Sequence, residues 1–95
     1  YIEYNPQDAS VLKKVMQFHE KPTLSVAQNY LAAGNFLWNT GMFCGKVGTF
    51  IREFELHAPT LLKDVKEFMN GKASYDIIEK ISFDHAVMEK SNATV

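Results

Sequence analysis

The stretch from Phe36 to Phe43 reads Phe-Leu-Trp-Asn-Thr-Gly-Met-Phe, an apolar run interrupted by one amide and one glycine. Its large apolar and aromatic groups suit a packed, pleated surface. Asn39 and Gly41 are two residues apart, so in a strand they lie on one face. An amide offers two donors and an acceptor, and a glycine lets a ligand approach the backbone closely. The run predicts a buried strand carrying a ligand contact, with a turn or bulge at Asn39–Gly41 as the competing interpretation.

The composition bounds the size of the fold and the class of partner. The chain has 95 residues, of which 46% are hydrophobic and 13% aromatic, enough for one small folded domain. The formal net charge is -1, so the chain lacks the basic excess that neutralises a nucleic-acid backbone or an anionic bilayer. We therefore expect neither nucleic acid nor membrane as a partner.

A single cysteine, Cys44, cannot form a disulfide within the chain, and no apolar leader precedes the first strand. This pattern favours a reducing cytoplasm, where the sequon at residues 92–94 would have no meaning. Because Cys44 follows an apolar run and has no base at a suitable spacing, we expect a buried, unreactive thiol.

Both ends of the chain have strand character, with Tyr-Ile-Glu-Tyr at 1–4 and Ala-Thr-Val at 93–95. Domain boundaries usually fall in polar linkers instead. We therefore expect residues 1–95 to be a fragment of a longer chain that completes the sheet.

The first half of the chain predicts strand, strand, helix, strand. Residues 1–4 and 11–20 alternate with period two, and Pro22 ends the second strand. A helix capped by Thr23 or Ser25 carries a stripe at Ala27, Tyr30 and Leu31 and stops at Gly34–Asn35, before a strand over 36–47. A helix between strands is typical of an α/β fold with a parallel pair, often in a mixed sheet.

The second half predicts helices. One starts at Gly48–Thr49 and is closed by Pro59; the next is capped by Thr60 and ends at Asn70–Gly71. A shorter helix over 75–80 should bury Ile77, Ile78 and Ile81. A capped helix over 82–90 places Asp84 in or just before its first turn, where N–H groups favour a carboxylate.

Few residues offer catalytic chemistry. The three histidines, His19, His57 and His85, are scattered, so no zinc site is expected, and no glycine-rich phosphate loop occurs. Glu20, Lys21 and Asp84 remain. Taken singly, Glu20–Lys21 is a solvated ion pair and Asp84 a helix cap.

Together, five segments resemble the mannose-1-phosphate guanylyltransferase family, also called GDP-mannose pyrophosphorylase. They are Val-Met-Gln-Phe-His-Glu-Lys-Pro (15–22), Tyr30-Leu31 with Gly34, Leu-Trp-Asn-Thr-Gly-Met-Phe (37–43), His-Ala-Pro (57–59) and Ser-Phe-Asp-His-Ala-Val-Met-Glu-Lys (82–90). Phe83 and His85 stand where the family usually has Ile and Tyr, and Cys44-Gly45 replaces a bulkier pair.

The resemblance implies a Rossmann-like nucleotide-diphospho-sugar transferase fold and a specific reaction. The phosphate of mannose 1-phosphate attacks the α-phosphorus of GTP, which gives GDP-mannose and pyrophosphate. By the same resemblance Glu20 and Asn39 hold sugar hydroxyls beside Gly41, Lys21 holds the sugar phosphate as a catalytic residue, and catalytic Asp84 ligates Mg²⁺. Residues 1–95 are then the C-terminal, sugar-phosphate-binding part of a nucleotidyltransferase domain.

The orientation of Glu20 and Lys21, and the contacts to GTP, need further features of the chain. Strict strand alternation points Glu20 and Lys21 to opposite faces, so both reach one ligand only if the chain twists at Pro22. The family's glycine-rich GTP loop and second metal-binding Asp lie upstream, so these residues alone are expected to be inactive.

Three alternatives stay open: a pyrophosphorylase for another hexose 1-phosphate, a non-catalytic sugar-binding or regulatory module with this fold, and a plain helical interaction domain. The last predicts that Glu20, Asn39 and Asp84 lie far apart. The oligomeric state, including a homo-oligomer, and a fused isomerase domain are also left open.

Overall fold

A computed structural model describes residues 1–92. The sequence predicts one small domain, but the chain forms two compact units. The first consists of Tyr1–Phe43 with Asn92, and the second of Cys44–Ser91. The strand expected at 93–95 and most of the sequon lie outside the described residues.

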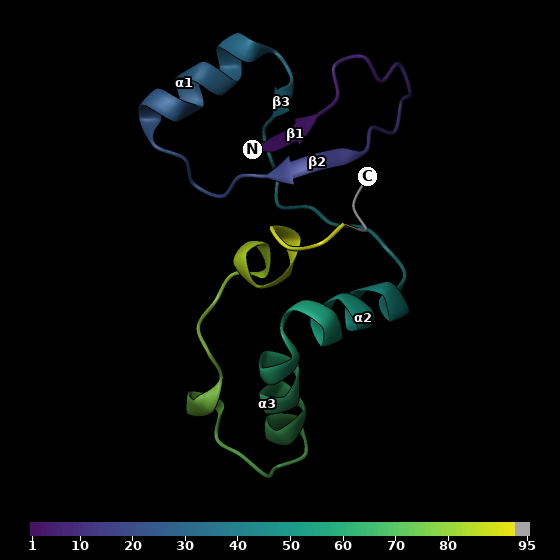
Figure 1. The fold of residues 1–95 in the computed structure, drawn as a ribbon. Helices are drawn as coiled ribbons and strands as arrows, with labels where there is room; N and C mark the ends of the chain where they lie inside the picture. Colours follow the sequence, from purple (N-terminus) through teal and green to yellow (C-terminus); the bar gives the residue numbers. More distant parts are fainter. Residues whose placement is uncertain (93–95) are drawn as a thin grey trace. The chain divides into compact units, whose positions relative to one another are not determined.

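The first unit is built on a three-stranded sheet with the order β2-β1-β3 (Figure 1). β1 spans Ile2–Tyr4, β2 spans Val15–Phe18 and β3 spans Phe36–Leu37. In β1, Ile2 lies opposite Phe18 of β2 and opposite Leu37 of β3. β1 is antiparallel to both of these strands. β2 and β3 therefore run in the same direction, as expected for strands joined by a helix, but β1 separates them.

Helix α1, Leu24–Ala33, connects β2 to β3. Gly34, with φ of 75°, is its C-cap, as the sequence predicts. Thr23 occupies the N-cap position, but its side chain makes no capping hydrogen bond. Tyr30 stacks on Phe36 of β3 at a ring-centroid distance of 4.1 Å, so α1 packs against the sheet face that carries Phe36. Leu31, expected to be buried beside it, is 69% exposed.

Both predicted long strands are shorter in the structure. β2 begins at Val15 rather than residue 11, because Asp8 accepts a hydrogen bond from the Ser10 backbone (2.9 Å) and holds the preceding residues in a turn. β3 ends at Leu37 rather than residue 47, because a second turn follows at Asn39. The extended prediction over 11–14 and 38–47 is therefore wrong.

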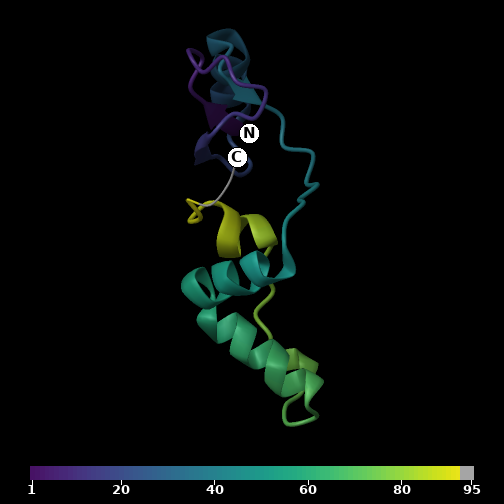
Figure 2. The ribbon, with the colours of Figure 1, turned by 90° about the vertical axis from the view of Figure 1, so that its right-hand side faces the viewer.

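The second unit is helical. α2 spans Val47–His57 and α3 spans Pro59–Met69, and the chain turns between them at Ala58 (Figure 2). Pro59 occupies the first turn of α3, where its missing N–H is tolerated, so Ala58 and not Thr60 is the N-cap. Asn70 caps the C-terminus and Gly71 follows with φ of 71°, as predicted.

The last two elements are short. η1 is a 3₁₀ turn over Tyr75–Ile77, where a helix to residue 80 was expected, and Ile77 is 50% exposed rather than buried. η2, Asp84–Met88, is a π-helical turn in which Ala86, Val87 and Met88 are buried. η2 packs against α2, where the Phe83 ring lies 6.0 Å from Phe50 and 5.5 Å from Phe54.

Across residues 1–92, no helix has both the length and the apolar character that a membrane crossing needs.

Candidate functional site

Glu20 and Lys21 follow directly on the end of the β1–β2 ladder. His19 donates its backbone N–H to the Tyr1 carbonyl at 2.8 Å, which extends the ladder by one residue beyond β2. Lys21 then has φ of 47°, and within residues 1–92 no other non-glycine residue has a positive φ. A side chain in this left-handed region is unfavourable by about 1–2 kcal/mol, and such residues concentrate at functional sites.

The left-handed residue brings both charged groups together. The Lys21 Nζ lies 3.6 Å from Oε1 of Glu20, so strand alternation does not separate them. The Glu20 side chain is only 13% exposed, whereas that of Lys21 is 84% exposed. The carboxylate is thus held against the protein, and the ammonium is presented to solvent. The change in backbone direction that would let Glu20 and Lys21 reach one ligand occurs at Lys21 itself.

His19, adjacent to Glu20, joins three elements of the first unit. Its Nε2 lies 3.2 Å from Oε2 of Glu3 in β1, and its Nδ1 lies 3.2 Å from the Tyr30 hydroxyl in α1. Its ring also contacts Phe36 of β3 at 5.7 Å between centroids. No local pattern in the sequence indicates this role, because the partners of His19 are distant in the chain and belong to no motif.

Asn39 and Gly41 form a turn. The Gly41 N–H donates to Oδ1 of Asn39 at 3.0 Å, and Gly41 has φ of 72°. This is an Asx turn, which glycine accommodates without a steric penalty. The prediction of two residues sharing one strand face is therefore wrong, and the competing turn interpretation is confirmed.

Asp84 is the first residue of η2. The Ser82 hydroxyl accepts the His85 N–H at 3.3 Å, and the Glu89 N–H donates to the Asp84 carbonyl at 2.9 Å, a π-helical bond. His85 Nδ1 lies 2.9 Å from Oε2 of Glu89, one helical turn away. Asp84 is thus carried on a locally bonded turn in which Ala86, Val87 and Met88 are buried. Among residues 1–92, no three acidic, histidine or cysteine side chains form a metal-binding group.

The predicted site residues fall in both units. Glu20, Lys21, Asn39 and Gly41 belong to the first, and Asp84 belongs to the second. Their convergence on a single cleft stays a prediction.

Cys44, predicted to be buried, is an exposed free thiol. The strand that would have covered it ends at Leu37.

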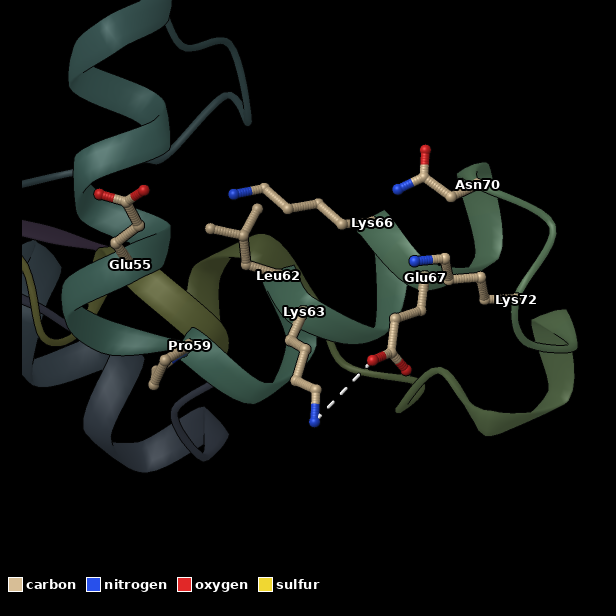
Figure 3. Close-up of a pocket in the computed structure, with 8 residues that line it drawn as sticks. All are labelled: Glu55, Pro59, Leu62, Lys63, Lys66, Glu67, Asn70 and Lys72. Atoms are coloured by element: carbon tan, nitrogen blue, oxygen red, sulfur yellow. Dashed lines mark ion pairs between the residues drawn. The ribbon is translucent and has the colours of Figure 1, made fainter.

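A separate pocket of about 370 Å³ lies on α2, α3 and the segment after α3 (Figure 3). Five of its eight lining residues carry a charged group, but most of its wall is apolar. The lining consists of Glu55, Pro59, Leu62, Lys63, Lys66, Glu67, Asn70 and Lys72. Lys63 and Glu67 pair across one helical turn at 3.9 Å. None of the predicted site residues lines this pocket.

Comparison with known proteins identifies the family. The model of the family described as nucleotidyl transferase matches residues 1–84. The chain belongs to the nucleotidyl transferase family. Its α/β character, a small sheet together with helices, agrees with a part of that fold.

Relatives within the nucleotidyl transferase family agree with the resemblance read from the motifs. A mannose-1-phosphate guanylyltransferase of Sinorhizobium fredii is 36% identical over 107 positions, which cover 100% of this chain and 21% of the relative. A putative enzyme of the same name from Vibrio cholerae serotype O1 is 31% identical, covering 100% and 23%. One from Escherichia coli K12 is 32% identical, covering 82% and 19%.

The chain therefore spans about a fifth of the length of these relatives. No solved structure gives a significant match. The family assignment and the three-stranded sheet together exclude the plain helical interaction domain.

Proposed function

We propose that the protein transfers a guanylyl group from GTP to mannose 1-phosphate, giving GDP-mannose and pyrophosphate. The names of the relatives support this reaction, and the motifs at residues 15–22, 37–43 and 82–90 support the mannose branch. Within that reaction, residues 1–95 supply the sugar-phosphate half of the site.

The observation that carries the proposal is the left-handed Lys21 beside Glu20. A carboxylate accepts hydrogen bonds from sugar hydroxyls, and an ammonium on a flexible stem follows a phosphate as a point charge. The Lys21 Nζ is 3.6 Å from Glu20 and largely solvated, so it can turn to an incoming phosphate at little cost. Sugar and phosphate contacts would then come from consecutive residues.

Asn39 completes the sugar contacts in this proposal. Its Oδ1 accepts the Gly41 N–H, so the amide N–H₂ group is oriented by the turn. The amide donors can reach a sugar hydroxyl oxygen, and Gly41, without a side chain, leaves room for the ring. Among residues 1–92, apart from the two chain neighbours of Gly41, no atom lies within 4 Å of a Cβ built on this glycine.

Asp84 is the residue proposed to hold Mg²⁺. A single carboxylate fits that ion, because Mg²⁺ usually takes one or two protein carboxylates and completes its shell with water and substrate phosphates. The chain thus fits as a partial donor set, to which GTP phosphates would add. Bound Mg²⁺ neutralises charge on the transferring phosphoryl group. Asp84 itself contributes orientation, since η2 fixes its backbone through the Glu89 hydrogen bond.

The reaction is tested with the complete protein that contains these residues. Purified protein is mixed with Mg²⁺, GTP and either mannose 1-phosphate, glucose 1-phosphate or N-acetylglucosamine 1-phosphate, and pyrophosphate release is measured. We expect kcat/KM for mannose 1-phosphate to exceed the others by at least about tenfold, the effect of one lost hydroxyl contact. Preference for another hexose would favour the alternative pyrophosphorylase, and no turnover with any sugar would favour the non-catalytic module.

Residues 1–95 alone should release no pyrophosphate, because the proposed GTP contacts lie elsewhere. Guanylyltransferase activity from the isolated chain would contradict its assignment as half a site.

A further inference from the structure

The imidazole of His19 is held from two sides. Nε2 lies 3.2 Å from the Glu3 carboxylate of β1, and Nδ1 lies 3.2 Å from the Tyr30 hydroxyl of α1. The side chains of His19 and Glu3 are 22% and 26% exposed, so both contacts are partly shielded from water. Partial burial makes such polar contacts more directional and more costly to break.

With the Glu3 carboxyl ionised and the imidazole neutral, the chemistry of the partners places the ring proton on Nε2. An ionised Glu3 can only accept, so Nε2 must donate. In the neutral ring Nδ1 is then the acceptor, and the Tyr30 hydroxyl donates to it. The result is a directed chain from Tyr30 through His19 to Glu3, with each group oriented by the next.

His19 is also the last residue that the ladder holds before the charged pair. Its N–H donates to the Tyr1 carbonyl at 2.8 Å, and its own carbonyl accepts from the Tyr1 nitrogen at 2.7 Å. The next residue is Glu20, and the one after it is the left-handed Lys21. Any rotation of the His19 backbone would therefore move both proposed substrate contacts.

We infer that His19 is a positioning residue, which Glu3 and Tyr30 hold so that Glu20 and Lys21 meet a sugar phosphate in the correct orientation. The inference rests on the proposed function, since it concerns the same sugar-phosphate contacts. His19 itself touches no substrate in this scheme. It acts by fixing the point at which the strand ends and the unfavourable Lys21 conformation begins.

The inference is tested in the complete protein with three variants and a control. Tyr30→Phe removes only the hydroxyl and keeps the ring that stacks on Phe36. His19→Leu removes both hydrogen bonds, whereas His19→Gln keeps one donor and one acceptor. Tyr4→Phe is the matched control: it removes the hydroxyl that donates to the Gly34 carbonyl at 3.1 Å, a bond of the same unit that does not involve His19.

We expect Tyr30→Phe to raise the KM for mannose 1-phosphate by about three- to tenfold, the effect of one lost hydrogen bond, and His19→Leu to raise it further. His19→Gln should restore much of the loss. The KM for GTP should stay near the parent value in all three, and Tyr4→Phe should change neither constant.

Two results would overturn the inference while the proposed function stands. One is an unchanged sugar-phosphate KM in Tyr30→Phe and His19→Leu when Glu20→Gln in the same assay raises it. The other is a fall in Tm accompanied by equal rises in both KM values, which indicates a purely structural role. If His19→Leu does not fold, Tyr30→Phe decides alone. A parent protein with no activity on any sugar phosphate would instead contradict the proposed function, and the inference with it.

Discussion

The Lys21 ammonium lies 3.6 Å from the Glu20 carboxylate even though consecutive strand residues point to opposite faces. The left-handed φ of Lys21 makes this approach possible. Glycine adopts this conformation freely. A lysine here lowers the stability of the backbone but places a positive charge at a defined position.

Replacing Lys21 separates these two effects. Lys21→Gly should make the protein more stable than Lys21→Ala by about 1 kcal/mol, because alanine keeps the unfavourable φ and glycine relieves it. Both variants lack the ammonium, so both should raise the KM for mannose 1-phosphate by about tenfold or more. Chemical denaturation and steady-state kinetics measure the two quantities. Equal stability of the two variants would mean that the left-handed conformation is not kept in solution.

Asn39 has a turn role and a proposed sugar role, and two substitutions distinguish them. Asn39→Ala removes the acceptor for the Gly41 N–H, so it should destabilise the turn by about 1 kcal/mol and raise the sugar-phosphate KM more than the GTP KM. Asn39→Asp keeps that acceptor but loses the amide donors. We expect it to restore stability without restoring the KM. Recovery of both would reduce Asn39 to a turn residue.

Asp84→Asn tests the proposed Mg²⁺ ligand. The amide keeps the shape of the carboxylate but loses its charge, so kcat should fall by about 100-fold or more and more Mg²⁺ should be needed for half-maximal rate. Binding of Mn²⁺ as a spectroscopic probe should weaken in parallel. Asp76→Asn is the matched control, since Asp76 is an exposed carboxylate in η1 of the same unit. An equal effect of both substitutions would remove the special role of Asp84.

The pKa of the Asp8 carboxyl is held below its ordinary value of 3.8, chiefly by the Ser10 hydroxyl, then by the Ser10 N–H, with Lys13 adding to the effect. A depressed folded pKa stabilises the turn above pH 3.8, and this stabilisation is lost as the pH falls through the lower, folded value. Ser10→Ala should therefore raise the pKa of Asp8 toward 3.8. NMR titration of ¹³C-labelled aspartate carboxyls measures it, with Ser25→Ala as the control; no change in Ser10→Ala would contradict the bond.

Two glycines near the start of α2 should respond differently to substitution by alanine. Gly48 lies within the helix, and in the described part of the chain nothing beyond its neighbours and the helix backbone lies within 4 Å of a built Cβ. Gly48→Ala should therefore stabilise the protein by about 0.5–1 kcal/mol. A Cβ at Gly45 would lie 3.1 Å from the Phe50 ring, which must move to admit it. Gly45→Ala should give less stabilisation or a net loss. Thermal unfolding of the pair decides, and a larger gain at position 45 would be the contrary result.

Local signals in the sequence predicted the C-terminal ends of α1 and α3, but not the N-cap of α3 or the lengths of η1 and η2. Gly34 caps α1 and Gly71 follows the Asn70 cap of α3, both in the left-handed conformation, because the end of a helix depends on only a few neighbouring residues. The charged pair and the family were likewise readable from short motifs, since Glu20-Lys21-Pro22 and residues 37–43 are contiguous.

Strand length and side-chain networks were not readable in this way. Alternation over residues 11–20 and 36–47 continues past the true strands because it registers apolar spacing, whereas pairing depends on a partner strand and on side chains such as Asp8 and Asn39 that bind the backbone. The contacts of His19 with Glu3 and Tyr30 come from two other elements, so no local pattern contains them.

The position of β1 between β2 and β3 also bears on how the first unit folds during synthesis. β1 leaves the ribosome before both of its neighbours, yet Ile2 has its second partner only when Leu37 is available, after the whole of α1 has been made. One edge of β1 therefore stays unpaired until β3 has been made, and during that time it can pair with a strand of another chain. The β1–β2 hairpin should form first, and docking of β3 should be the slower step because it closes the longer loop.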